Sequence, residues 1–214
     1  MAKNTALRKH IISIILLSGL IYTISAGATT ILGVDIDKVA NDAELVFEGE
    51  VILQESRHDA RSGLINTYVT FAIYDILKGI NSSNTIELKF AGGATNGEII
   101  EVGGLSIPKI GEQGIYFIES TTRDLLNPIL GWSQGHFIIE EENGDRRVST
   151  INRHPVTKIQ PVSTIPATIK KPRLLVEGKN DVAAGVLVDP NDLALDRALT
   201  VEEFKNSILE LLTD

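Results

Sequence analysis

Short segments between Leu45 and Thr150 alternate apolar and polar residues, and this period of two constrains the fold more than any other feature of the sequence. Successive side chains of a β-strand point to opposite faces of a sheet, so the alternation predicts strands with one buried face. Gly, Asn and Ser residues separate the segments and favour turns. The sequence therefore predicts a mainly β fold: an OB-like antiparallel barrel of about 6–7 strands with a C-terminal helical extension.

The dipeptide Asn143-Gly144 predicts a tight hairpin within this region. A type I′ turn needs positive φ at both central positions, and Asn followed by Gly tolerates it best. Alternating segments at 137–141 and 147–150 flank the dipeptide as its two strands. Glycine is also frequent between Gly92 and Gly104, which predicts a short strand between tight turns.

The first 28 residues have the features of an export signal. A basic start without acidic residues precedes an apolar run over 11–24, and Ala26-Gly27-Ala28 fits the A-x-A cleavage pattern. The apolar run has about 14 residues, whereas a membrane-spanning helix needs about 20. We predict cleavage after Ala28, with Ala26 as the alternative site. The product would be secreted or periplasmic without stable membrane insertion, and an uncleaved anchor is the alternative reading.

The composition is acidic and free of cysteine. The chain has 20 Lys and Arg against 28 Asp and Glu, and loss of the signal would remove three basic residues and no acidic one. Such a surface repels nucleic acid, and no basic cluster with interleaved aromatic residues offsets it. Nucleic acid is therefore excluded as an expected partner. Without cysteine there is neither a disulfide nor a lipidated amino terminus, so stability must come from an apolar core.

Beyond the β region the chain changes character. Asp189-Pro190, with Asp192, resembles a helix start. Thr200 and Glu203 form a capping box in front of a second helix. This helix carries an apolar stripe that we expect to dock on the same chain, made of Val201, Phe204, Ile208 and Leu211. The expected segments are a signal peptide at 1–28, a β-barrel domain at 29–160, a Pro-containing linker at 161–188 and a helical tail at 189–214.

Residues Gly131 to Gly135 match the G-x-S-x-G elbow that exposes a nucleophilic serine in hydrolases. That chemistry requires a helix after Ser133 and a histidine that activates its hydroxyl. Here the segment from His136 onward alternates as a strand, and the one later histidine, His154, stands beside a proline. A turn leading into a strand is the favoured interpretation, and a serine hydrolase using Ser133 is an alternative.

Other patterns point weakly to bound ions or phosphates. His58 and Asp59 could bind a metal with His136 or His154, but their spacing does not place three ligands together. Acidic residues near the C-terminus lack the oxygen spacing of a calcium loop. The glycine-rich loop at 92–97 leads towards a strand, whereas a phosphate-binding loop leads into a helix. We therefore expect no metal and no cofactor.

The strand sequences resemble a known family. The order "LVFEGEV", "TYVTFAIYDILKG", a glycine-rich loop and "IGEQGIYFIES" is similar to netrin-like modules, which include the tissue inhibitors of metalloproteinases and have an OB-type barrel. The chain is also similar to a group of uncharacterised exported bacterial proteins. They share an "LKG" strand end, an "AGG" loop and a "G-x-x-QG-x-F" strand start, matched by Leu77-Lys78-Gly79, Ala91-Gly92-Gly93 and Gly131 to Phe137.

The resemblance implies a fold and a looser role in binding. Those inhibitors chelate the zinc of their protease through an amino-terminal cysteine, which this chain lacks. The expected function is an exported, non-enzymatic binding protein, a protein-interaction or protease-modulating module whose partner is another exported or surface protein. A small-molecule or ion carrier is a further alternative to the hydrolase.

Binding would fall to the connections of such a scaffold, because a rigid sheet leaves recognition to its loops. The candidate loops are 55–63, 92–97 and 120–131. The candidate binding residues in and beside them are Arg57, His58, Asp59, Arg61, Gly92, Gly93, Asn96, Arg123, Asp124 and Trp132.

Overall fold

The computed structural model describes residues 30–60, 62–142, 144–162, 174–176, 182–189 and 195–213. The predicted signal peptide with Ala26 and Ala28 lies outside the described residues. So do Arg61, Asn143, most of the predicted linker and the predicted helix start that follows Asp189.

Strands dominate the described structure, as the alternation predicts. In chain order the elements are β1 Thr30–Leu32, α2 Ile36–Asp42, β2 Leu45–His58, β3 Ile65–Lys78, β4 Thr85–Ala91, β5 Gly93–Thr95, β6 Glu98–Ile100, β7 Gln113–Ile118, the 3-10 turn η1 Trp132–Gly135, β8 His136–Glu142, β9 Asp145–Thr150, β10 Val156–Ile159, β11 Leu174–Val176, β12 Val186–Val188, the 3-10 turn η3 Leu195–Arg197, and α3 Val201–Thr213.

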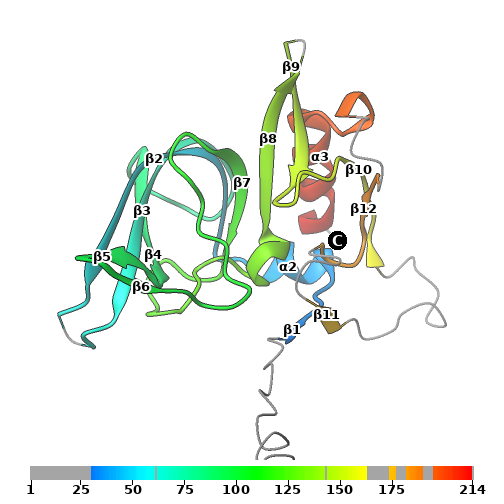
Figure 1. The fold of residues 1–214 in the computed structure, drawn as a ribbon. Coiled ribbons are helices and arrows are strands. Elements are labelled where there is room, and N and C mark those ends of the chain that lie inside the picture. Colours follow the sequence, from blue (N-terminus) through cyan, green and yellow to red (C-terminus); the bar gives the residue numbers. More distant parts are fainter. Residues whose placement is uncertain are drawn as a thin grey trace, which may run out of the picture.

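A six-stranded antiparallel sheet organises the molecule, in the order β4-β3-β2-β7-β8-β9 (Figure 1). The mainly β fold with a C-terminal helix is confirmed. The predicted closure into an OB-like barrel is wrong, because β4 and β9 are the two edges of an open sheet in the described part of the chain. Three smaller two-stranded pairings join β1 to β11, β10 to β12 and β5 to β6.

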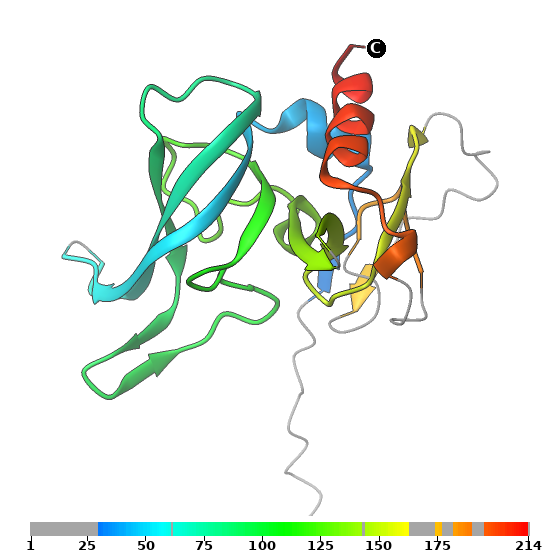
Figure 2. The ribbon, with the colours of Figure 1, turned by 90° about the horizontal axis from the view of Figure 1, so that it is seen from above.

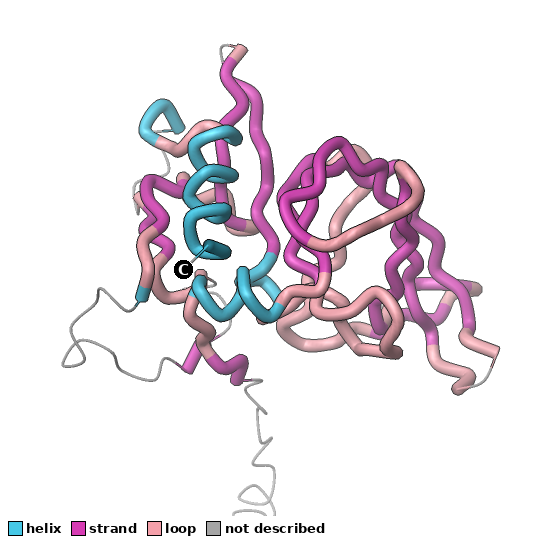
Figure 3. The backbone as a smooth tube through the Cα atoms, turned by 180° about the vertical axis from the view of Figure 1, so that it is seen from behind, coloured by secondary structure: helices cyan, strands magenta, loops and turns pink. Residues whose placement is uncertain are grey.

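The open sheet contributes to two apolar cores. Strand β7 is buried on both faces: Ile115 and Phe117 lie in a core with the two helices, while Tyr116 and Ile118 lie in a core enclosed by β2, β3 and β4. Beyond β7 the sheet therefore continues into β8 and β9, which cover the helical core. Figure 3 shows the curled strands on one side of the molecule and both helices on the other.

The last helix completes the first core. The predicted stripe of α3 is buried, and the Phe204 ring centroid lies 4.8 Å from that of Phe137 on β8. Helix α3 packs beside α2, β9 and β10. The stripe thus docks on its own chain.

The predicted hairpin is present. Strands β8 and β9 pair from Phe137↔Thr150 to Glu142↔Asp145, and Gly144 adopts a φ of 86°. The glycine-rich region forms a second hairpin, in which Asn96 and Gly97 have φ values of 52° and 83° between β5 and β6.

The capping box also forms as predicted. The backbone N–H and hydroxyl of Thr200 donate to the Glu203 carboxylate, each at 2.9 Å, and the Glu203 N–H donates to the Thr200 hydroxyl at 3.2 Å. The backbone N–H and then the hydroxyl of Thr200 lower the pKa of Glu203. A carboxyl group whose pKa is lowered in the folded state stabilises the fold at pH values above its unfolded pKa of about 4.3. This stabilisation is lost as the pH falls through the folded pKa.

We expect Thr200→Ala to lower the free energy of unfolding at pH 7 by about 1 kcal/mol, because α3 loses its N-cap. Urea denaturation measures the change, and the difference from wild type should become smaller as the pH falls through the lowered folded pKa of Glu203. Ser207→Ala on the same helix is the control, with an expected change within about 0.5 kcal/mol. Equal effects of the two substitutions would contradict the role of the cap.

Candidate functional site

Two of the predicted binding loops meet at one end of the curled sheet. Strand β2 includes residues 55–58 of the first loop, and its last residue, His58, contacts the β5–β6 hairpin: His58 Nε2 lies 3.6 Å from the Glu98 carboxylate. The Ser56 and Thr67 hydroxyls are 2.9 Å apart, and Thr67 donates to the Gly92 carbonyl at 2.8 Å. Figure 2 shows the β5–β6 hairpin projecting beside the ends of β2 and β3.

Glycine is required where the two loops touch. A Cβ on Gly93, whose φ is 131°, would lie 2.2 Å from the Thr67 hydroxyl oxygen and 2.5 Å from that of Ser56. The Gly92 N–H donates to the Ile65 carbonyl at 2.9 Å. Asp59 accepts hydrogen bonds from the backbone N–H and hydroxyl of Ser62 within the β2–β3 turn. These residues shape the loops, and their role in binding stays a prediction.

The outer edge of the β5–β6 hairpin is exposed. Among the described residues β6 pairs with β5 alone. All three β6 residues are exposed, and the exposed fractions of Ile99 and Ile100 are 71% and 38%. An edge strand with unpaired backbone groups can accept a further strand. We call this region the hairpin surface, made of His58, Asn96, Glu98, Ile99 and Ile100.

The third predicted loop lines a pocket with Tyr68, and Arg57 lies over the Tyr68 ring. The Arg57 guanidinium lies 3.6 Å from the centroid of the Tyr68 ring, a cation–π arrangement. It also lies 3.0 Å from the Glu55 carboxylate and 3.7 Å from that of Glu87. Tyr68 and Glu87 line a small pocket of about 180 Å³ together with Arg123 from the 120–131 loop.

Polar contacts hold this loop against the sheet. Glu44 accepts hydrogen bonds from the hydroxyl of Thr121, from the hydroxyl of Ser120 at 2.7 Å and from the Thr121 N–H at 3.2 Å. The Thr121 hydroxyl, followed by that of Ser120, lowers the pKa of Glu44. Lys89 pairs with Asp124. We call this region the Tyr68 pocket. Arg123 lines it, while Arg57 and Asp124 contact its lining residues Tyr68 and Lys89.

Sequence reasoning missed the strand residues of the Tyr68 pocket. Tyr68, Glu87 and Lys89 stand on the polar positions of alternating strands, which marks them as facing outward but not as binding residues. Only the register between neighbouring strands, Tyr68↔Lys89 and Thr70↔Glu87, places them side by side.

Trp132 lies apart from the other candidates, in η1 between β7 and β8. Its φ is 62°, and it lines neither the hairpin surface nor the Tyr68 pocket. The neighbouring Gln134 explains the turn. Its amide accepts from the Val34 N–H at 2.8 Å and donates to the Leu32 carbonyl at 3.1 Å, which fixes η1 to the segment before α2.

The serine of the G-x-S-x-G match is placed unfavourably for nucleophilic catalysis. Ser133 is buried in η1, which leads into strand β8. The buried His136 ring directs Nε2 to the Glu112 carboxylate at 2.8 Å and forms no hydrogen bond with Ser133. Nucleophilic serines require such a bond to a base.

Within the described residues no three His, Asp or Glu side chains gather as metal ligands. In the same part of the chain, helices long and apolar enough to span a membrane are absent.

Comparison of the chain with protein-family models, curated proteins and solved structures finds no match in any of the three.

Proposed function

We propose that the chain is an exported, non-enzymatic binding protein that holds an extended segment of a partner protein at the hairpin surface. The observation that carries this proposal is the exposed edge of β6, with Ile99 exposed over 71% of its surface. A partner strand that pairs with an edge gains main-chain hydrogen bonds, and its alternate side chains are read by neighbouring residues.

The setting of this edge favours a protein partner. Acidic Glu98 and Glu101 flank the two isoleucines, so a segment that alternates apolar and basic residues would complement them. The loops beside the edge are fixed by the contacts among Ser56, Thr67 and Gly92, which limits the ordering cost on binding. The resemblance to netrin-like modules and the predicted signal peptide agree with a binding role outside the cytoplasm.

Quantitative mass spectrometry of a native pull-down tests the proposal. The carboxy-terminally tagged protein is recovered from periplasm and medium, and a bait mass that begins at Thr29 would support cleavage after Ala28. We expect a stoichiometric companion with the wild-type chain. Ile99→Lys should reduce its recovery by at least about tenfold, because central apolar residues dominate interface energies.

Ile80→Lys is the matched control. Ile80 is 94% exposed in the turn after β3, away from the hairpin surface, and this variant should retain the companion. Loss of the companion from both variants, or its retention by Ile99→Lys, would overturn the assignment to the hairpin surface.

A further inference from the structure

The sheet forks where β8 leaves β7. The two strands pair at Tyr116↔His136, Ile115↔Phe137 and Gly114↔Ile138, and there the pairing ends. Strand β8 continues to pair with β9 as far as Glu142. Within the described structure, the side of β8 that faces β7 therefore has no strand partner beyond Ile138.

The chain before β7 turns away from β8 at the fork. The Val51 N–H donates to the Glu112 carbonyl at 3.0 Å, and the Gly111 N–H donates to the Val51 carbonyl at 2.8 Å. These bonds tie the 109–113 turn to β2. A cleft of about 380 Å³ opens between this turn and β8. We call it the fork cleft, lined by Lys109, Glu112, Gln113, Ile139, Glu141 and Arg153.

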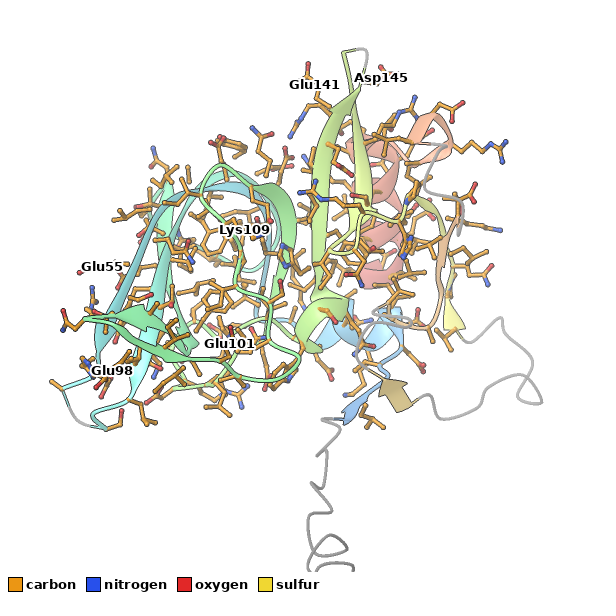
Figure 4. All side chains as sticks on the ribbon, viewed as in Figure 1. Glu55, Glu98, Glu101, Lys109, Glu141 and Asp145 are labelled. Carbon is orange, nitrogen blue, oxygen red and sulfur yellow. The ribbon has the colours of Figure 1, made fainter. Side chains whose placement is uncertain are left out.

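Opposite charges without ion-pair partners stand on the two sides of the fork cleft. Lys109 comes from the turn before β7, and Glu141 comes from β8 (Figure 4). Neither has an ion-pair partner among the described residues. The other charged groups of the cleft are already paired: Arg153 lies 2.8 Å from Glu140, and Glu112 lies 2.8 Å from His136.

Polar and aromatic contacts hold Glu112 and Gln113 on the β7 side of the fork cleft. The His136 side chain is 2% exposed and that of Glu112 is 12% exposed. The His136 ring lies against the Tyr116 ring at an interplanar angle of 34°, with centroids 5.0 Å apart. The Gln113 amide donates to Glu50 at 3.1 Å. A preformed cleft with fixed polar groups binds a ligand at low ordering cost.

We infer that the fork cleft binds a short extended peptide with free termini. Lys109 pairs with its carboxylate and Glu141 with its ammonium group. The backbone of the peptide lies along the free side of β8 and pairs with the main-chain groups that β7 leaves unpaired. This site is independent of the hairpin surface, because the two share no residue.

Isothermal titration calorimetry with trialanine tests the inference. We expect a Kd of about 10 µM to 1 mM, as suits a small ligand with few contacts, and a rise in Tm with ligand concentration. Trialanine acetylated at its amino end and amidated at its carboxyl end should bind at least about tenfold more weakly, since it lacks both charges. This ligand-side control needs no change to the protein.

Variants locate the binding. Lys109→Gln and Glu141→Gln should each weaken trialanine binding by about tenfold, while Lys158→Gln on β10 should leave the Kd unchanged. Ile99→Lys should also bind trialanine like wild type, so failure of the proposed partner binding and failure of this site can be told apart. Absence of trialanine binding, equal binding of the capped peptide, or unchanged binding by both cleft variants would overturn the inference.

Discussion

Phe204→Ala should lower the free energy of unfolding by about 3–5 kcal/mol, among the largest effects of any single substitution in this chain. Phe204 is fully buried in the first core and packs on Phe137, so truncation removes apolar contacts and leaves a cavity. The cavity cannot close easily, because β8 is held between β7 and β9. Urea denaturation followed by circular dichroism measures the change.

Leu209→Ala on the same helix is the control. Leu209 is 42% exposed, so its truncation should cost less than about 1 kcal/mol. A Phe204→Ala variant as stable as Leu209→Ala would show that α3 does not pack on the sheet as described.

Lys205→Ala should lower the free energy of unfolding by about 3 kcal/mol, because the buried charge of Glu48 then has one ion-pair partner fewer. Glu48 on β2 is 3% exposed and pairs with Lys205 and Arg146, while Lys205 also lies 2.9 Å from Asp75. Burial acts to lower the pKa of Lys205, but its hydrogen bonds to Glu48 and Asp75 outweigh this and raise it.

The raised pKa fixes the pH range of this contribution. The stabilisation by charged Lys205 is fully present at pH values below the unfolded lysine pKa of about 10.4. It is lost as the pH rises through the higher folded pKa. The difference in free energy of unfolding between wild type and Lys205→Ala, measured by urea denaturation, should therefore be full at pH 7 and should decrease as the pH rises through the raised folded pKa of Lys205.

Lys205→Met separates the effect of charge from that of packing, since it keeps an apolar side chain and removes the ammonium group. It should lower the free energy of unfolding nearly as much as Lys205→Ala does. Glu202→Ala is the control, because exposed Glu202 lies 3.6 Å from Lys205 and should change stability by less than about 0.5 kcal/mol. Tolerance of Lys205→Met at pH 7 would contradict the electrostatic role of this residue.

Local signals predicted the local structure well. Alternation gave the strands, the Asn143-Gly144 dipeptide gave the β8–β9 hairpin, and the Thr200 capping box gave the start of α3. Each of these depends on residues close together in the sequence, where backbone sterics and short-range hydrogen bonds decide the outcome.

Closure of the sheet could not be predicted in the same way, because it depends on pairing between distant strands. One signal was present: Ile115 to Ile118 is a continuous apolar run, which is typical of a strand buried on both faces. Read in this way, β7 indicates a second core and argues against a single closed barrel.

The candidate site was predicted in part. Arg57, which lies near the end of β2, and Arg123 were identified because glycine-rich and polar connections stand out in the sequence. Tyr68 and the fork cleft were missed, because their positions follow from strand register and from the point at which β7 and β8 separate.

The packing of α3 also sets an order of events during synthesis. Phe137 and Val148 are made long before Phe204, yet all three belong to the same core. A growing chain that lacks α3 would therefore present this apolar face of β8 and β9 to solvent, as a surface for chaperones or for other chains. This core therefore cannot be completed before α3 has been made and has left the ribosome.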